Sequence, residues 1–369
     1  IDSSFRAPPG ARPRQILLMR PELRAAFPLA TLPAGRRGFL LWLAEDGTKE
    51  YALKPEEIWW FLLECAEDPA REMRLLYLLT PRWQQMFPDA TTRFGQDRFG
   101  HWLRAMFVLK APSAWADPSN WPEQPVPGDQ IRIAWQARPA WRRRFPEALE
   151  EIDQAKALLS WLGDHSSGLP ETLRAWCATL DPEATARAIC RRGVNMISHF
   201  CYPSGLRTSA QSIVDGLLMA DWAVSLRDVP VDRRKDEPIH HHFVGLEHHE
   251  TTLMHIQPDP YFREAHVLSG LHSRQPRSYR IGYWYWEMDT IPESWKLPAL
   301  QTDELWAATR FVGDALTSHF DQPVFTLPPG VALSSFQRRS RDHFGVPYGK
   351  FAFLFVFHMM SIMERKNPL

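Results

Sequence analysis

The chain has 369 residues, of which 44% are hydrophobic, so it is long enough for two domains and apolar enough to bury a large core. Lysine plus arginine number 43, as do aspartate plus glutamate, so the formal net charge at pH 7 is zero. This balance argues against nucleic acid as the main partner, because domains that bind nucleic acid carry a clear excess of basic residues.

Cysteine usage and hydropathy bear on where the protein works. The four cysteines form no C-x-x-C pair and are few for the length, which is typical of a reducing compartment, so we expect a cytoplasmic protein. The longest apolar run, residues 351–363, is too short to span a bilayer and contains His358. We therefore predict no transmembrane segment and no signal peptide, whereas peripheral contact with a membrane stays open.

Residues 1–15 are rich in proline and arginine, and we expect them to be poorly ordered. Residues 16–192 then contain one pattern three times, in which a proline is followed two residues later by leucine or tryptophan and six residues later by Phe-Pro. The copies start at Pro21, Pro81 and Pro139 and end in Trp-Leu pairs at residues 42–43, 102–103 and 161–162. Agreement at so many positions predicts a helical domain with three internal repeats.

The prolines of this pattern have a physical reason. The first proline suits the first turn of a helix, where its missing N–H costs nothing, and the second ends the helix at the residue before it. Tryptophans at equivalent places in a repeat favour core packing over a platform for stacked ligands. We expect this domain to serve as a scaffold or to dock a protein partner, with residues 112–127 as a surface connector.

Residues 193–350 alternate between strand-like and helix-like segments. An apolar run at residues 194–197 leads through a turn containing Gly205 into an amphipathic helix at residues 206–218. Five more apolar runs follow, at residues 223–226, 252–256, 279–284, 303–307 and 323–327. This alternation predicts a Rossmann-like α/β domain with a parallel sheet, whose ligands bind at the carboxyl ends of the strands.

Two cofactor interpretations fit the residues poorly. A dinucleotide fingerprint needs three glycines, whereas Gly205 is alone in its turn, although Asp228 stands about where a ribose-binding acid is expected. Five histidines lie within residues 240–249, but they match no metal-binding spacing and sit among charged residues. A solvated loop is therefore favoured there, and we predict no metal.

Several segments of this half carry a resemblance to a known family. They are Gly193-Val194-Asn195 with Ser204-Gly205-Leu206, Leu253-Met254-His255-Ile256 with Asp259, Gly282-Tyr283-Trp284-Tyr285-Trp286-Glu287, Asp303-Glu304-Leu305-Trp306-Ala307, and the final stretch ending in Glu364-Arg365-Lys366. In this order they resemble bacterial glycosyltransferases of the GT-B fold, of the family-four or "group 1" type. The resemblance covers residues 193–369.

The resemblance implies the N-terminal half of a GT-B fold, with residues 193–350 as the acceptor domain. Residues 351–369 would be the first strand and loop of a donor domain that is otherwise absent, so we expect no turnover by this chain alone. It further implies transfer of a sugar from a nucleotide-diphosphate donor to a glycan or lipid-linked acceptor, without a metal or other cofactor. Such a reaction belongs to polysaccharide or glycoconjugate synthesis.

The resemblance also implies roles for particular residues. Gly205, Leu206 and Lys366 would bind the donor phosphates, Glu287 would be the catalytic or acceptor-side carboxylate, and His255, Asp259 and Trp286 would line the acceptor cleft. A purely structural role for Glu287 stays open, and Ser361 stands where the family often has a phosphate-binding arginine. A non-catalytic interaction module is the main alternative function, and an oxidoreductase that binds a nucleotide cofactor is the other.

Overall fold

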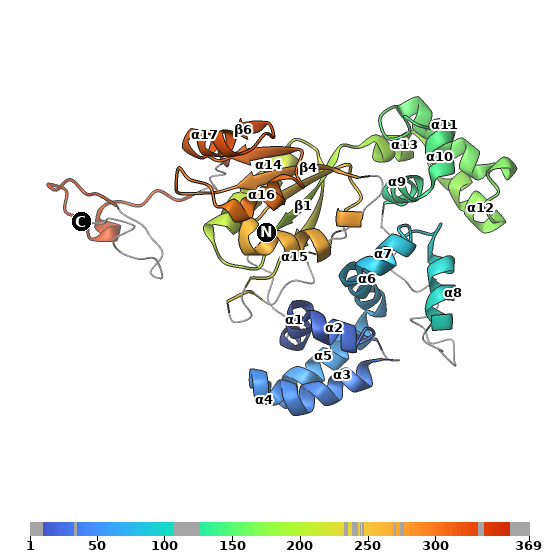
Figure 1. Cartoon of the computed structure of the whole chain (residues 1–369), viewed down its shortest axis with the longest axis horizontal. Coiled ribbons are helices and arrows are strands. Elements are labelled where there is room, and N and C mark those ends of the chain that lie inside the picture. The colour runs from blue at the N-terminus through green and yellow to red at the C-terminus, as the bar shows by residue number, and fades with distance from the viewer. Residues whose placement is uncertain are drawn as a thin grey trace. The chain divides into compact units, whose positions relative to one another are not determined.

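A computed structural model of the chain describes residues 10–32, 35–106, 126–231, 235–237, 243, 245, 247–268, 271–273, 277–330 and 336–354. The chain divides into two compact units, residues 1–330 and 331–369. In the first unit a helical region, residues 11–190, precedes a sheet region, residues 193–330, in which strands and helices alternate (Figure 1). The sheet-bearing unit thus ends at Gly330 rather than at residue 350, because residues 336–350 are mostly exposed and add no strand.

The first helix, α1 (Ala11–Met19), includes residues that composition predicts to be poorly ordered. Arg14 on α1 is only 2% exposed, and its guanidinium donates to Glu64 of α5 (Pro55–Glu67) at 3.1 Å and to Glu72 of α6 (Pro69–Leu79) at 2.5 Å. A guanidinium paired in this way can be buried, whereas an unpaired one cannot. The expectation of disorder is therefore wrong for residues 11–15, and residues 1–9 lie outside the described residues.

Three short helices begin at the three prolines of the sequence pattern, as predicted. They are α2 (Pro21–Ala26), α7 (Pro81–Met86) and α10 (Pro139–Arg144). Each is followed by the phenylalanine of the pattern, whose backbone N–H donates to the carbonyl of the apolar residue four positions earlier, and the second proline comes next. The tryptophans Trp83 and Trp141 are buried, which confirms their predicted role in the core.

The longer helices α3 (Arg36–Trp42), α8 (Gln96–Met106) and α11 (Ile152–Gly163) carry the closing aromatic residues. Their rings pack against the phenylalanines that end the short helices. The centroid distances are 5.8 Å for Phe27 and Phe39, 5.3 Å for Phe87 and Phe99, and 5.5 Å for Phe145 and Trp161. Phe39 and Phe99 are almost fully buried, so each ring pair lies in a hydrophobic core.

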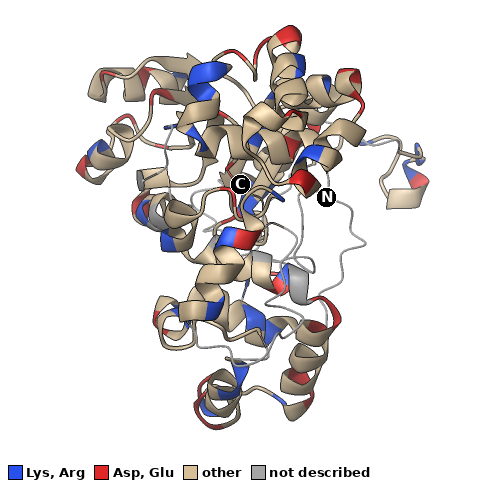
Figure 2. Cartoon of the chain, turned by 90° about the vertical axis from the view of Figure 1, so that its right-hand side faces the viewer, with Lys and Arg blue, Asp and Glu red and all other residues tan. Residues whose placement is uncertain are grey.

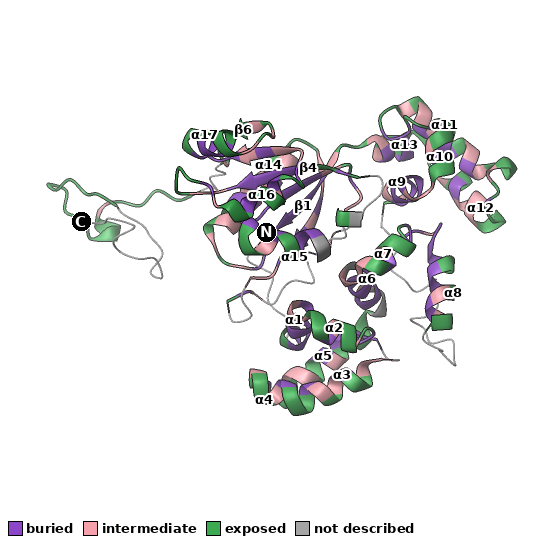
Figure 3. Cartoon of the chain, in the orientation of Figure 1, coloured by how far each residue is buried: buried purple, intermediate pink, exposed green. Residues whose placement is uncertain are grey.

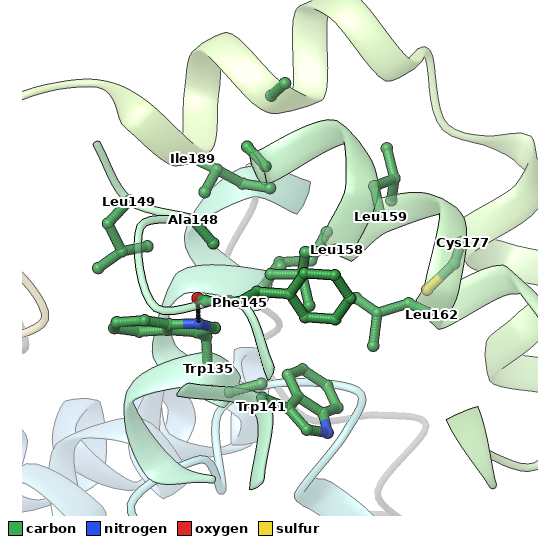
Figure 4. Close-up of a cluster of buried hydrophobic side chains, with 14 of the residues drawn as sticks. Trp135, Trp141, Phe145, Ala148, Leu149, Leu158, Leu159, Leu162, Cys177 and Ile189 are labelled. Carbon is green, nitrogen blue, oxygen red and sulfur yellow. Dashed lines mark hydrogen bonds between the residues drawn. The ribbon is translucent and has the colours of Figure 1, made fainter. Parts of the chain in front are cut away.

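A buried hydrogen bond fixes the chain after two of the short helices. The Tyr77 hydroxyl of α6 donates to the Phe87 carbonyl at 2.6 Å, and the Trp135 indole of α9 (Pro127–Ala137) donates to the Phe145 carbonyl at 2.9 Å (Figure 4). Tyr77 and Trp135 each lie four residues before the proline that starts their short helix. The equivalent residue before Pro21 is Leu17, which has no polar side-chain atom and is buried by packing alone. Aromatic side chains with a polar tip thus satisfy a carbonyl inside the core.

The remaining described elements of the helical region are shorter or closer to the sheet. They are the π-helical turn η1 (Leu43–Gly47), α4 (Thr48–Tyr51), the 3₁₀ turn η3 (His165–Ser167), α12 (Glu171–Thr179) and α13 (Pro182–Cys190). Arg132 of α9 donates to the carbonyls of Ile189 and Arg191 at the end of α13. Because the first strand begins at Gly193, this buried guanidinium fixes the chain where it enters the sheet.

The sheet region holds six parallel strands, close to the six that the apolar runs predict. They are β1 (Gly193–Ser198), β2 (Ala223–Asp228), β3 (Thr251–His255), β4 (Tyr279–Trp284), β5 (Glu304–Ala307) and β6 (Val324–Thr326). Their order is β2-β1-β3-β4-β5-β6, and every neighbouring pair is parallel. The predicted α/β architecture with a parallel sheet is therefore confirmed.

Helices and their hydrophobic side chains cover both faces of this sheet. On one face Met196, Leu253 and Tyr283 pack with residues of α14 (Gly205–Met219). On the other face Ile197, Met254 and Trp284 pack with α15 (Pro258–Leu268), α16 (Lys296–Ala299) and α17 (Arg310–His319). The inner strands β1, β3 and β4 are almost wholly buried (Figure 3), as expected of a parallel sheet covered on both sides, whereas two of the three residues of the edge strand β6 are exposed. The 3₁₀ turns η5 (Leu271–Ser273) and η6 (Glu293–Trp295) complete the region.

The second unit is described by residues 336–354, which include the 3₁₀ turn η7 (Asp342–Phe344). Residues 351–354 form no strand, and Phe351, Phe353 and Leu354 are 85% to 91% exposed. The strand expected to start at Phe351 is thus absent from these four residues. A strand that is apolar on both faces needs a neighbour on each side, and the described residues supply none. Residues 355–369, with Lys366, lie outside the described residues.

Candidate functional site

The strand order locates the candidate site. The connections lead from β1 toward β2 on one side and from β3 toward β6 on the other, so the order reverses between β1 and β3. At such a switch point the loops diverge beyond the carboxyl ends of the strands and leave a place for a ligand. The residues that follow β1, β3 and β4 therefore make up the candidate site.

Asn195 and Gly193 hold β1 against β3. The Asn195 side chain is 1% exposed, donates to the His249 carbonyl at 2.8 Å and to Thr252 Oγ1 at 3.0 Å, and accepts from the His249 N–H at 2.9 Å. A Cβ atom at Gly193 would lie 2.2 Å from the buried His249 ring, so a side chain there would have to displace that ring. These two residues of the family-like motif therefore stabilise the pairing of β1 with β3 and do not belong to the candidate site.

The turn after β1 ends in a capped helix. Ser204 caps α14, because its hydroxyl accepts from the Arg207 N–H at 3.2 Å. Gly205, the first residue of α14, is exposed, and a Cβ atom there would meet nothing within 4 Å. Leu206 beside it is half-buried. The two residues expected to bind donor phosphate thus lie at the start of a helix, where free N–H groups and the helix dipole favour an anion.

The same turn is tied to the end of β2. The Cys201 N–H donates to Asp228 Oδ1 at 2.9 Å, and the Val229 N–H donates to the Ser198 carbonyl at 2.8 Å. His199 is buried, and its Nδ1 lies 2.8 Å from the Val229 carbonyl, so this nitrogen carries the proton and donates. Asp228, which the dinucleotide interpretation assigns to a ribose, therefore binds the turn.

His255 ends β3 and is completely buried. Its Nε2 lies 2.9 Å from the Ser209 hydroxyl of α14, and that hydroxyl lies 2.6 Å from the Tyr285 hydroxyl, which follows β4. Burial lowers the pKa of His255 to about 4, so the imidazole is neutral at neutral pH. The expectation placed His255 in the acceptor cleft; here it contacts protein atoms behind that edge of the sheet.

Sequence reasoning missed Ser209 and Tyr285. A signal for Ser209 was present, because it falls one helical turn before Ile213 on the apolar side of α14, where a buried hydroxyl needs a partner. Tyr285 belongs to the family-like motif, but its direction depends on Tyr283. The two rings stack at 5.4 Å, and the Tyr283 hydroxyl donates to the Leu327 carbonyl.

Trp286, Glu287 and Asp259 surround the exit of β4. The Trp286 indole is half-buried, donates to the Thr290 carbonyl at 2.9 Å and packs on Trp295 at a centroid distance of 4.9 Å. The exposed Asp259 accepts from the Ser294 hydroxyl at 3.0 Å. Trp286 and Asp259 therefore both contact η6. Glu287 is exposed directly after Trp286.

Electrostatics and metal-ligand chemistry add little to this site. Basic and acidic residues intermingle along the ribbon (Figure 2). Among the described residues, no three His, Cys, Asp or Glu side chains are grouped so as to hold a metal ion. His240, His241 and His242 lie outside the described residues. No helix in the described part of the chain combines the length and the hydropathy needed to cross a bilayer.

The cysteines are unpaired, and three of the four are buried. Burial raises the pKa of Cys65 and of Cys177 to about 12 and raises that of Cys201 further, which makes them poor nucleophiles at neutral pH. Comparison of the chain with protein families, with curated proteins and with solved structures finds no match in any of the three.

Proposed function

We propose that the protein is a glycosyltransferase that takes a sugar from a nucleotide-diphosphate donor and passes it to a glycan or lipid-linked acceptor. The sheet region would be the acceptor-side, N-terminal domain of a GT-B enzyme acting in the cytoplasm in polysaccharide or glycoconjugate synthesis. The family-like motifs and the parallel sheet with its switch point between β1 and β3 support this proposal. The donor would be a substrate, and the chemistry needs no resident cofactor.

One observation carries the proposal: Ser209 and Tyr285 join the start of α14 to the exit of β4 through a 2.6 Å hydrogen bond. A helix terminus suited to an anion is thereby linked to the segment that carries an exposed carboxylate, Glu287. Both features would serve sugar transfer, because charge builds on the leaving diphosphate and a carboxylate can accept the proton of the acceptor hydroxyl.

The test is an assay of the natural gene product, at its full natural length, against a panel of UDP-, GDP- and ADP-sugars. We expect release of a nucleoside diphosphate from at least one donor, and a loss of about 100-fold in kcat in Glu287→Gln. Glu293→Gln is the matched control, because Glu293 is another exposed carboxylate, paired with Lys296. A folded protein that releases nothing from any donor would contradict the proposal.

An interaction module without catalysis is the second candidate, and the helical region favours it. Trp59 and Trp60 of α5 are 61% and 46% exposed, which is unusual for tryptophan. We infer that the three proline-initiated units form a repeat array that docks a protein partner. This candidate gains if no donor is turned over while Trp59→Ser with Trp60→Ser abolishes binding of a partner that the wild-type protein binds.

A further inference from the structure

A chain of three side chains connects three separate elements at the carboxyl edge of the sheet. Ser209 lies in the second turn of α14, His255 ends β3, and Tyr285 directly follows β4. The Ser209 hydroxyl is central, at 2.9 Å from His255 Nε2 and 2.6 Å from the Tyr285 hydroxyl. Ser209 is 7% exposed and His255 is fully buried, so water does not compete freely for these contacts.

The chemistry of the three groups suits a neutral chain. A serine hydroxyl has one proton and two lone pairs, so it can donate to one neighbour while it accepts from the other. His255 is neutral because burial lowers its pKa to about 4, and the Tyr285 hydroxyl, like that of serine, can donate or accept. Each contact can therefore form without a buried charge, and the loss of one hydroxyl breaks the chain.

Because Tyr285 is fixed by its contacts, it also limits where the next residues of the loop can lie. Its ring lies 5.5 Å from that of His255 and stacks on Tyr283, so packing and the hydroxyl contact together fix its direction. Trp286 follows immediately, with its indole turned back onto the Thr290 carbonyl. The segment 286–290 is thus closed by a hydrogen bond between its first and last residues, and it is held to the rest of the domain at Tyr285 and through the packing of Trp286 on Trp295.

We propose that Ser209 is a positioning residue, which through Tyr285 sets the place of the segment 286–290 relative to the start of α14. The segment carries Glu287, so Ser209 would fix the distance between the carboxylate and the helix terminus. Only the catalytic meaning of that distance rests on the proposed glycosyltransferase function. The mechanical link is a property of the fold and can be tested without any substrate.

The test compares Ser209→Ala and Tyr285→Phe in the full chain, each of which removes one hydroxyl and leaves the packing nearly intact. Ser212→Ala is the matched control, because Ser212 lies on the same helix, is half-buried and donates to the Thr208 carbonyl of its own helix at 3.1 Å. The probe is the indole N–H of Trp286 in protein labelled with ¹⁵N-tryptophan, assigned with Trp286→Phe. The Trp135 indole, bonded to the Phe145 carbonyl in the helical region, is the internal reference.

We expect the Trp286 indole to shift and to exchange with solvent about fivefold faster in both variants, with the Trp135 indole unchanged. Ser212→Ala should leave both resonances in place, and Ser209→Thr, which keeps a hydroxyl, should restore most of the wild-type signal. An unchanged Trp286 resonance in Ser209→Ala or in Tyr285→Phe would overturn the proposal. So would equal movement of the Trp135 resonance, which would indicate general loosening of the fold.

An activity assay separates this inference from the proposed function. If a donor is turned over, Ser209→Ala should lower kcat about tenfold with little change in KM, because the carboxylate is misplaced while the donor still binds. An unchanged kcat together with a moved Trp286 resonance would overturn the role given to Glu287 and retain the mechanical link. An unmoved resonance would overturn the link whatever the activity.

Discussion

The helical region and the carboxyl edge of the sheet bury their polar groups in different ways. In the helical region the buried groups include charges held in pairs, such as Arg14 with Glu72, and Asp89, which accepts from Arg98 at 2.8 Å and from Arg138 at 2.9 Å. At the carboxyl ends of β1 and β3 and on α14 the buried polar side chains are uncharged; they are Ser198, His199, Ser209 and His255. Buried charged groups at this edge, Arg227 and Asp236, belong to the end of β2 and the loop after it.

The difference matters because the two kinds of contact respond differently to change. A buried ion pair fixes one geometry, and the loss of one partner leaves an uncompensated charge. A neutral hydroxyl or imidazole can exchange donor and acceptor roles at a smaller cost. Charged pairs therefore suit a rigid support, and neutral contacts suit an edge that must adjust when a ligand arrives.

The largest expected effect comes from breaking a charged pair in the helical region. Arg14→Met should lower the free energy of unfolding by about 3 to 5 kcal/mol, because Glu72 is fully buried and would lose its main partner. Arg12→Met is the control, since Arg12 is 45% exposed in its pair with Glu57 and should cost no more than about 1 kcal/mol. Urea unfolding followed by far-ultraviolet circular dichroism measures both. Similar costs for the two variants would remove the basis of the comparison.

A second prediction concerns the neutral edge and acid. Burial lowers the pKa of His255 to about 4, whereas an unfolded histidine titrates near 6.5. Between pH 6.5 and pH 4 the unfolded state therefore binds a proton at His255 that the folded state does not bind. The contribution of this group to the free energy of unfolding is fully present above pH 6.5 and is lost as the pH falls toward 4. The loss is about 3 kcal/mol for this one group.

His255→Gln tests this sign. The variant should be less stable than the wild type at pH 7. Between pH 7 and pH 4, however, its free energy of unfolding should fall less, because its unfolding no longer takes up the proton that His255 binds. Unfolding curves at several pH values provide the comparison. An identical pH dependence in the two proteins would mean that folding does not lower the pKa of His255.

Much of the fold follows from local sequence patterns. The six strands are short apolar runs, and helices such as α2 and α6 begin at prolines, so a few neighbouring residues suffice to place them. The burial of Arg14 could not be foreseen, because its partners lie 50 and 58 residues further along the chain. Helix α15 was missed as well, since Pro258 and Pro260 in its first turn read as a loop.

The candidate site was predictable in its location and less so in its members. Parallel strands put His255 and Gly205 at one edge of the sheet, which the alternation of apolar and polar residues already indicates. The contact between Ser209 and Tyr285 joins residues 76 apart, and no local pattern reveals it. The phosphate-binding role of Lys366 stays a prediction, because that residue lies outside the described part of the chain.

The smallest expected effect comes from a neutral hydrogen bond in the helical region, which tests whether charge or location makes the buried contacts there costly to lose. Tyr77→Phe removes a neutral hydrogen bond inside the helical region, and the Phe87 carbonyl still accepts from the Ala90 N–H at 3.1 Å. We expect a cost of about 1 kcal/mol in urea unfolding. Tyr279→Phe, which removes a solvent-exposed hydroxyl bonded to Glu304 in the sheet region, should cost almost nothing.

The size of the Tyr77→Phe effect bears on the comparison itself. A cost near that of Arg14→Met would mean that the loss of any buried contact in the helical region is costly. The location of a contact, and not its charge, would then determine how much its loss destabilises the protein. A cost several times smaller would show that buried charge sets the rigidity of the helices. The contacts among Ser209, His255 and Tyr285 would then be easier to break than the ion pairs of the helical region, because losing one of them leaves no buried charge without a partner.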